Sequence, residues 1–271
     1  MDEIKIIPME STEISSYQEK ASLDVQIATA KHYPRDIIQA KNDSIALATM
    51  DMATAESCGY SLPRGKTTIQ GPSVHLARII AQNWGNIRVE ARVIDITSTQ
   101  IVSQAVCFDL QKNYAVKVEV RRSIIDKYGK KYKDDMITMT GNAGNAISFR
   151  NAVFNVIPKN VVESVFKASK DMITGDLGSE CKLKEKRNGW MAYYRKTYKV
   201  TDDQILKLLK VNTIDGIKQD QIITLAGVAQ SIKDGDTTIA EAFATKPDNT
   251  KSVSDKKKDL KDNKIPKQEM P

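Results

Sequence analysis

The sequence contains little of the residue types that build metal centres and disulfide frameworks. Its 271 residues include three cysteines and two histidines. Cys58, Cys107 and Cys181 are odd in number and widely spaced, so neither a disulfide framework nor a zinc site is indicated. His32 and His75 are isolated, which favours structural or solvated roles over metal ligation. We therefore expect no cofactor, with Mg²⁺ entering only as a counterion.

Long apolar runs are also missing. No stretch approaches the roughly 20 apolar residues that span a bilayer. The first residues, MDEIKIIPMESTE, begin acidic and lack the basic-then-apolar pattern of an export signal. These absences predict a protein of the cytoplasm, without a membrane partner.

A complete phosphate-binding P-loop is absent, although Gly65-Lys66-Thr67 resembles its end. The motif needs a glycine where this chain has Tyr60, and the segment before it has a helical rather than a strand pattern. No nucleophile elbow or H-E-x-x-H motif occurs either. We therefore expect a protein that is not an enzyme and works by binding alone.

One catalytic alternative stays open, a magnesium-dependent nuclease. Asp109 and Glu119, on neighbouring predicted strands, offer the carboxylates that such a site uses. Arg121 stands where a titratable lysine would be wanted, and arginine stays protonated.

What the chain does have is positive charge and enough apolar content for a core. The net charge is +7, the isoelectric point is about 9.1, and 41% of the residues are hydrophobic. Clustered lysine and arginine favour a polyanionic partner, because they release counterions from phosphates. Residues 246–271 hold much of this charge with little apolar content, which predicts a disordered tail.

Periodicity predicts an α+β fold: a three-stranded antiparallel sheet packed with helices, then a small C-terminal helical module. The expected domains are an α+β core over 1–178, the helical module over 179–245 and the disordered tail over 246–271. Helices are predicted at 12–31, about 35–58, 73–84 and 140–157, and strands at 87–95, 99–110 and 114–126.

Alternation in the predicted strands separates an apolar face from a charged one. Arg88, Arg92 and Arg121 fall on the charged face, together with Glu90 and Glu119. That face is a candidate binding surface for phosphates. The alternative is a solvated, charge-balanced surface.

The turn over 126–135, DKYGKKYKDD, interleaves basic and aromatic side chains. Lys127, Lys130 and Lys131 lie beside Tyr128 and Tyr132, a composition that suits single-stranded nucleic acid. A mobile hairpin tip is the alternative.

The segment TGNAGNAISFRNAVFNVIP, residues 140–158, begins with small residues that permit close approach. They are expected to open a helix whose free N–H groups face another helix or a phosphate backbone. Arg150 lies within its apolar stretch and must be paired with an acid or aimed at a ligand phosphate. We interpret it as aimed at a phosphate.

The order of these parts resembles a known group. YSLPRGKTTIQGPSVHLARIIAQNWGN, the meander and TGNAGNAISFRNAVFNVIPKNVVE are similar to phage and prophage proteins with the pattern YxxPRGGxxxxGPSxRLAExxAxxWGN. The similarity covers about residues 31–175. That group is distantly similar to the RecT and Red-beta single-strand annealing proteins.

The resemblance implies an ATP-independent bacteriophage recombination protein that coats single-stranded DNA, forms a homo-oligomer and anneals complementary strands in the host cytoplasm. A phage exonuclease or a host single-strand-binding protein is a candidate partner. A non-catalytic phage assembly or interaction protein is the alternative. The implied DNA-binding residues, which add to the turn lysines, are Arg64, Lys66, Ser73, Arg88, Arg92, Arg121, Asn142, Asn145 and Arg150. All are expected to converge in one cationic channel.

Overall fold

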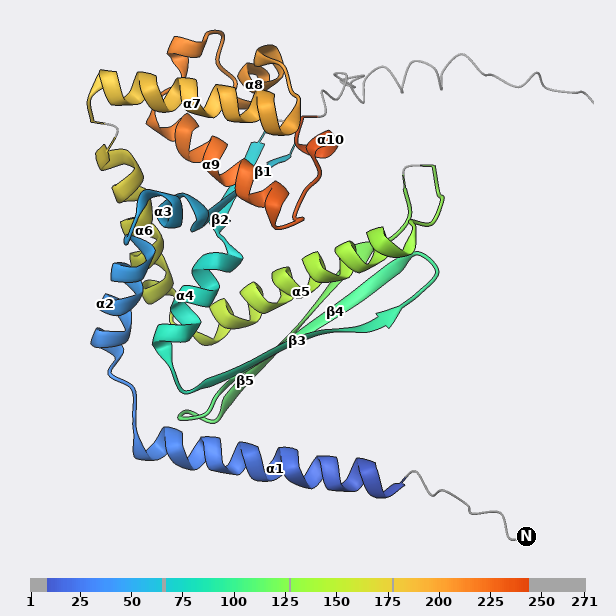
Figure 1. The fold of residues 1–271 in the computed structure, drawn as a ribbon. Helices are drawn as coiled ribbons and strands as arrows, with labels where there is room; N and C mark the ends of the chain where they lie inside the picture. The colour runs from blue at the N-terminus through green and yellow to red at the C-terminus, as the bar shows by residue number, and fades with distance from the viewer. Residues whose placement is uncertain (1–8, 65–66, 127, 177, 244–271) are drawn as a thin grey trace, which may run out of the picture.

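The secondary structure is mostly helical, with two separate antiparallel sheets (Figure 1). The computed structural model describes residues 9–64, 67–126, 128–176 and 178–243. The helices are α1 (Met9–His32), α2 (Ile37–Ala48), α3 (Met52–Ser57), α4 (Val74–Trp84), α5 (Asp134–Val156), α6 (Lys159–Asp176), α7 (Glu180–Tyr198), α8 (Asp202–Leu209), α9 (Gln219–Lys233) and α10 (Ile239–Ala242). The strands are β1 (Gly59–Arg64), β2 (Thr67–Pro72), β3 (Ile87–Ile96), β4 (Gln100–Asp109) and β5 (Tyr114–Ser123).

The predicted meander is confirmed, with strand order β3-β4-β5. Ala105 of the central strand pairs with Ala91 on one side and Val118 on the other, so these small and β-branched side chains share one face. Helix α5 packs along that face (Figure 1). The predicted α+β class is therefore confirmed, and the predicted tail over 246–271 lies outside the described residues.

The small residues of α5 serve its contact with the sheet. A Cβ added at Gly141 would lie 2.9 Å from Ile101 Cδ1, and one at Gly144 would lie 2.5 Å from Ser103 Oγ. Any larger residue at these positions would require the neighbouring side chains of the sheet to move. The prediction that this segment opens a helix is wrong, because α5 begins at Asp134, before it.

Two further expectations need correction between residues 35 and 72. The long helix expected over 35–58 is two helices, because Asp51 caps α3 with a 2.7 Å hydrogen bond from the Thr54 amide. The segment after it is a β-hairpin, in which Leu62 pairs with Ile69. The sequence predicted only a basic turn there.

The main core lies where α2, α4 and α6 meet the C-terminal half of α5. Leu76 and Ile80 of α4 pack with Val153 of α5 and Val165 of α6, and all four are fully buried. Helix α4 begins at Val74, one residue after the predicted start, and Ser73 is its N-terminal cap. This core fixes the base of the hairpin relative to the sheet.

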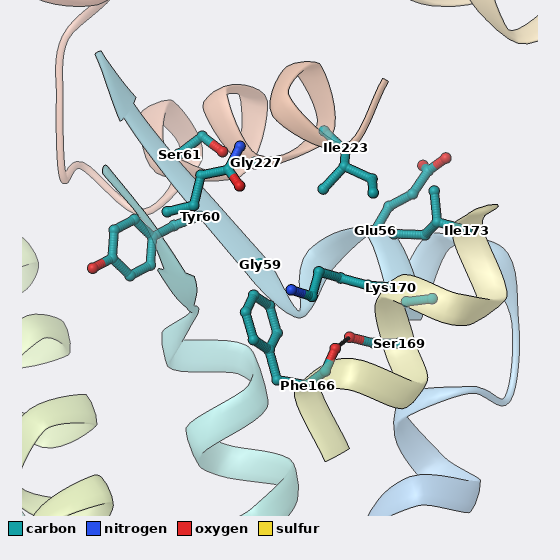
Figure 2. Close-up of a pocket in the computed structure, with 13 residues that line it drawn as sticks. Glu56, Gly59, Tyr60, Ser61, Phe166, Ser169, Lys170, Ile173, Ile223 and Gly227 are labelled. Carbon is teal, nitrogen blue, oxygen red and sulfur yellow. Dashed lines mark hydrogen bonds between the residues drawn. The ribbon is translucent and has the colours of Figure 1, made fainter. Parts of the chain in front are cut away.

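The C-terminal helices dock on the hairpin through α9 (Figure 2). The Ser231 hydroxyl donates to the Ser61 carbonyl at 3.0 Å, and the Ser61 amide donates to the Ser231 hydroxyl at 3.2 Å. A Cβ added at Gly227 would lie 2.9 Å from the Ser61 nitrogen. Helix and strand are therefore in direct backbone contact.

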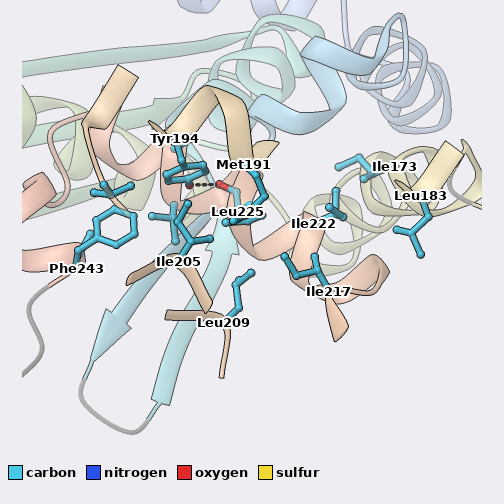
Figure 3. Packing of buried hydrophobic residues seen from close by; sticks show 14 of the residues in the cluster. Ile173, Leu183, Met191, Tyr194, Ile205, Leu209, Ile217, Ile222, Leu225 and Phe243 are labelled. Atoms are coloured by element: carbon cyan, nitrogen blue, oxygen red, sulfur yellow. Dashed lines mark hydrogen bonds between the residues drawn. The ribbon is translucent and has the colours of Figure 1, made fainter. Parts of the chain in front are cut away.

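A second core holds α7 to α10 together (Figure 3). Tyr194 is fully buried there, and its hydroxyl donates to the Leu225 carbonyl at 2.6 Å. The cluster also includes Ala55 of α3 and Ile173 of α6. Its apolar packing therefore crosses the predicted boundary between the α+β core, 1–178, and the helical module, 179–245.

Helix α1 lies on the side of the sheet opposite α5 (Figure 1). The link after it is anchored by Arg35, whose guanidinium donates to both Asp109 carboxylate oxygens at 2.6 and 2.8 Å and lies over Trp84 at 4.9 Å. Most side chains of α1 from residue 16 onward, where the structure describes them, are exposed. Among the described residues, no helix combines the length and apolar character needed to cross a membrane.

Candidate nucleic-acid interface

The face of the sheet turned away from α5, here called the outer face, carries several cations. Arg92 and Arg121 are exposed there, and so is Lys117. None of the three forms an ion pair with another described residue. Arg88 differs, because Glu19 of α1 and Glu90 of its own strand both pair with it. Three of the four cations are therefore available to a ligand.

The central strand gives this face an apolar row. Val102, Val106 and Phe108 alternate with the residues that face α5, and the polar Gln104 lies between the two valines. The register places Val102 between Asp95 and Arg121 and Val106 between Glu90 and Lys117. Phe108 lies between Arg88 and Ala115. Val102 is buried, while Val106 and Phe108 are half-buried. Apolar surface flanked by cations is the arrangement that accepts unpaired bases beside their phosphates.

Carboxylates share the outer face and reduce its charge. Glu119 accepts a hydrogen bond from Gln104 at 3.2 Å, and Asp95 pairs in register with Val102. These carboxylates support the alternative of a solvated, charge-balanced surface. The neutralisation is incomplete, because three cations of the outer face form no ion pair with another described residue.

The turn after β5 lies at the same end of the sheet as the β3–β4 connection, since the Ile124 amide donates to the Thr99 carbonyl at 2.9 Å. Lys130 and Lys131 are exposed, and Tyr128 is 82% exposed. Tyr132 instead packs against a small apolar cluster that includes Ile124. Lys127 lies outside the described residues.

Arg150 does not point to open solvent, contrary to our interpretation. Its guanidinium lies 3.5 Å from the Asp236 carboxylate and 4.6 Å from the centre of the Tyr60 ring. The alternative, pairing with an acid, is what the structure contains. The acid, Asp236, lies 86 residues further along the chain.

Arg122 approaches the same segment from β5. Its guanidinium donates to the Gly235 carbonyl at 3.1 Å, next to Asp236. Tyr60, Arg122 and Arg150 are called here the arginine–tyrosine cluster. Two of its members escaped sequence reasoning. The alternation that placed Arg121 outside could have indicated that Arg122 faces inward, but nothing in the sequence connects Tyr60 with Arg150.

The electrostatics of Asp236 are unusual for a carboxylate beside two arginines. Burial raises its pKa, Arg150 lowers it, Asp234 raises it and Arg122 lowers it, and the net result is a raised pKa. The Arg35–Asp109 pair shows the opposite balance. Burial of Asp109 is outweighed by the hydrogen bonds from Arg35 and from the Lys112 and Gln111 amides, so its pKa is lowered.

The remaining expected DNA-binding residues have other surroundings. Ser73 is buried, and its hydroxyl accepts from the Leu76 amide and donates to the Ser57 carbonyl, so it serves as a helix cap. Lys66 and the side chain of Arg64 lie outside the described part of the chain. The expected single channel is not found among the described residues, because Arg150 lies on the α5 side and Arg92 and Arg121 on the outer face.

The two asparagines expected at a helix start lie well inside α5. Asn142 is exposed. Asn145 is half-buried, and its Oδ1 atom has no hydrogen-bond partner among the described residues. Because the amides near them are bonded within the helix, no free N–H groups are available there for a phosphate.

The two carboxylates of the nuclease alternative are not brought together. Asp109 pairs in register with Tyr114 and faces the α5 side, whereas Glu119 pairs with Gln104 and faces outward. Asp109 is also held by Arg35. In the part of the chain that the structure describes, no group of three or more histidine, cysteine or acidic side chains is placed to hold a metal ion.

A recess lies between α3, β1, α6 and α9 (Figure 2). Its charged residues are already engaged: Glu56 pairs with Lys186 at 2.8 Å, and the Lys170 ammonium lies 4.5 Å from the centre of the Phe166 ring. The recess therefore marks the junction of the two cores and offers no evident catalytic group.

Comparison with known proteins adds no relative: no protein-family model, curated protein or solved structure matches the chain.

Proposed function

We propose that the protein binds single-stranded DNA on the outer face of the sheet and anneals complementary strands without nucleotide hydrolysis. The observation that supports this most directly is the set of three unpaired cations, Arg92, Lys117 and Arg121, on both sides of the row that contains Phe108. Cations that lack an internal partner gain free energy when they displace counterions from a phosphate backbone.

The apolar central row favours unpaired strands over duplex. A single strand can turn its bases toward Val106 and Phe108 while its phosphates lie near the cations of the edge strands. A duplex keeps its bases stacked inside and offers this row nothing to contact. The motif resemblance to RecT and Red-beta proteins supports the same choice, and on that resemblance the protein acts in phage recombination.

Binding is tested with the triple variant Arg92→Ala, Lys117→Ala, Arg121→Ala. The matched control removes three exposed lysines of the C-terminal helices, Lys184, Lys196 and Lys207, and so changes the net charge equally. Fluorescence anisotropy of a labelled oligonucleotide over a salt series should show a slope reduced by about 2 for the first variant, at about 0.7 per phosphate contact. Equal slopes in the two variants would contradict an outer-face site.

Annealing is tested separately, with complementary oligonucleotides and no nucleoside triphosphate. The wild-type protein should accelerate duplex formation, and the triple variant should lose most of that acceleration. Unlabelled duplex should compete poorly with single strands in the binding assay.

The homo-oligomer is also a proposal. Large apolar side chains are exposed at separate places, Ile37 and Ile38 in α2, and Ile96 and Met139 near the β3–β4 turn and α5. An assembly protein that does not bind DNA would show the same oligomer size with and without oligonucleotide, whereas the proposed function predicts that oligonucleotide changes it.

A further inference from the structure

The segment between α9 and α10 places a carboxylate against two arginines from other parts of the fold. Asp236 lies 3.5 Å from Arg150 of α5, and the preceding residue, Gly235, accepts a hydrogen bond from Arg122 of β5. The side chains of Arg150 and Asp236 are 13% and 6% exposed. An acidic loop thus covers cations that belong to the sheet and its helix.

The fit of this carboxylate is poor compared with the other buried Arg–Asp pair of the fold. Arg35 and Asp109 form two short hydrogen bonds, at 2.6 and 2.8 Å. Arg150 and Asp236 form a single contact at the outer limit of a hydrogen bond. The net pKa shift of Asp236 is upward, so its burial and the nearby Asp234 outweigh the two guanidinium groups.

Arg150, in contrast, has further contacts that do not involve the carboxylate. The Arg150 guanidinium lies over the Tyr60 ring and donates to the Asn151 side chain at 3.2 Å. Tyr60 in turn packs on Gly71, where an added Cβ would lie 2.8 Å from the ring. The ring is therefore in contact with both Gly71 and Arg150, which positions the guanidinium and leaves little of the ring for a base.

We infer that the arginine–tyrosine cluster is a phosphate-binding site that Asp236 occupies in the free protein, and that a phosphodiester of a bound single strand replaces this carboxylate. The inference rests on the proposed function for the identity of the ligand. A phosphodiester stays ionised at all physiological pH values and offers several acceptor oxygens, so it suits two guanidinium groups better than a carboxylate with a single 3.5 Å contact does.

The loop that carries Asp236 is anchored at α9 as well as at Arg122 of the cluster. The Asp236 amide donates to the Ser231 carbonyl at 2.9 Å, and Gly235 has a φ of +73°. A phosphodiester that binds Arg150 must displace the Asp236 carboxylate, and one that also binds Arg122 must replace the Gly235 carbonyl. Binding at the cluster would then be coupled to the position of the residues between α9 and α10.

The test uses two variants. Asp236→Asn removes the charge at nearly constant shape, and Asp236→Ala removes both the charge and the polar side-chain atoms. Asp171→Asn, an exposed acid of α6, is the control for net charge. The probes are a labelled oligo-thymidine of about 20 nucleotides, longer than one typical binding site, and inorganic phosphate followed by thermal shift. Urea denaturation verifies that each variant is folded.

The expected result is that both Asp236 variants bind the oligonucleotide on the order of tenfold more tightly than wild type and the control. Their salt slope should rise by about 0.7 for each arginine that gains a phosphate. Adding Arg150→Gln to Asp236→Asn should abolish the gain.

Each outcome decides between the two proposals. A gain in affinity that Arg150→Gln removes supports the masked site, even where the wild-type protein binds weakly. Wild-type binding that is unchanged in both Asp236 variants overturns the masked site and leaves the outer-face function standing. Absence of binding to either probe in every protein overturns both.

Discussion

Replacing Asp109 by asparagine should destabilise the protein strongly. Asp109 accepts two hydrogen bonds from Arg35 and one each, at 3.0 Å, from the Gln111 and Lys112 amides. The side chains of Arg35 and Asp109 are only 7% and 6% exposed. Asparagine keeps the shape but leaves the Arg35 charge buried without a counterion.

Removing one partner of a buried ion pair costs about 3–5 kcal/mol, a large part of the roughly 5–15 kcal/mol that keeps a protein folded. At about 2–4 °C per kcal/mol for a chain of this size, the melting temperature should fall by about 6–20 °C. Urea denaturation followed by tryptophan fluorescence measures the change. Trp84 contacts Arg35 and reports on this region, while Trp190 reports on the C-terminal helices.

The control is Glu163→Gln, which breaks an exposed pair with Lys159 one helical turn away. It should change the free energy of unfolding by less than about 0.5 kcal/mol. If Asp109→Asn behaves like this control, the Arg35–Asp109 pair is not what anchors the link between α1 and α2.

The same pair predicts a pH dependence. The pKa of Asp109 in the folded protein lies below its ordinary value of 3.8, so the unfolded chain takes up the proton first as the pH falls. The stabilisation by Asp109 is therefore fully present above about pH 4 and is lost as the pH drops through the folded-state pKa. The difference between wild type and Asp109→Asn should be constant near neutral pH and shrink below that window.

Three further predictions compare buried positions with exposed ones. Burial raises the pKa of Cys58 and of Cys107 to about 12, whereas Cys181 is exposed. A thiol reagent at pH 8 should therefore label one cysteine rapidly in the native protein and three in urea. Rapid labelling of more than one cysteine in the native protein would contradict the burial. Gly227→Ala should cost about 1–3 kcal/mol, because its Cβ would meet the Ser61 backbone. Gly189→Ala, where an added Cβ meets nothing within 4 Å, should instead stabilise α7 by about 0.5–1 kcal/mol. If Gly227→Ala and Gly189→Ala have equal effects on the free energy of unfolding, the close contact of α9 with β1 is refuted.

The elements with strong local signals were predictable from the sequence. The meander was predicted because polar and apolar residues alternate over ten residues in each strand, and α4 because an apolar helical stripe lies between Pro72 and Gly85. The β1–β2 hairpin was missed because its residues, GYSLPR and TTIQGP, do not alternate regularly. Its order depends instead on contact with α9, which local patterns do not report.

The candidate site was predictable only in part. Arg92 and Arg121 lie on the face that alternation gave them. The fate of Arg150 was not predictable, because its partners Tyr60 and Asp236 lie 90 residues before it and 86 residues after it in the chain. A buried arginine signals that a partner is needed without saying which of many acids supplies it.

The contact between Ser61 and Ser231 joins residues 170 positions apart. An isolated two-stranded hairpin is at best marginally stable in water, so β1 and β2 depend on a helix that leaves the ribosome long after they do. The hairpin must therefore remain unstable until α9 has been synthesised. A nascent chain stalled before α9 would keep an open strand edge exposed to other chains.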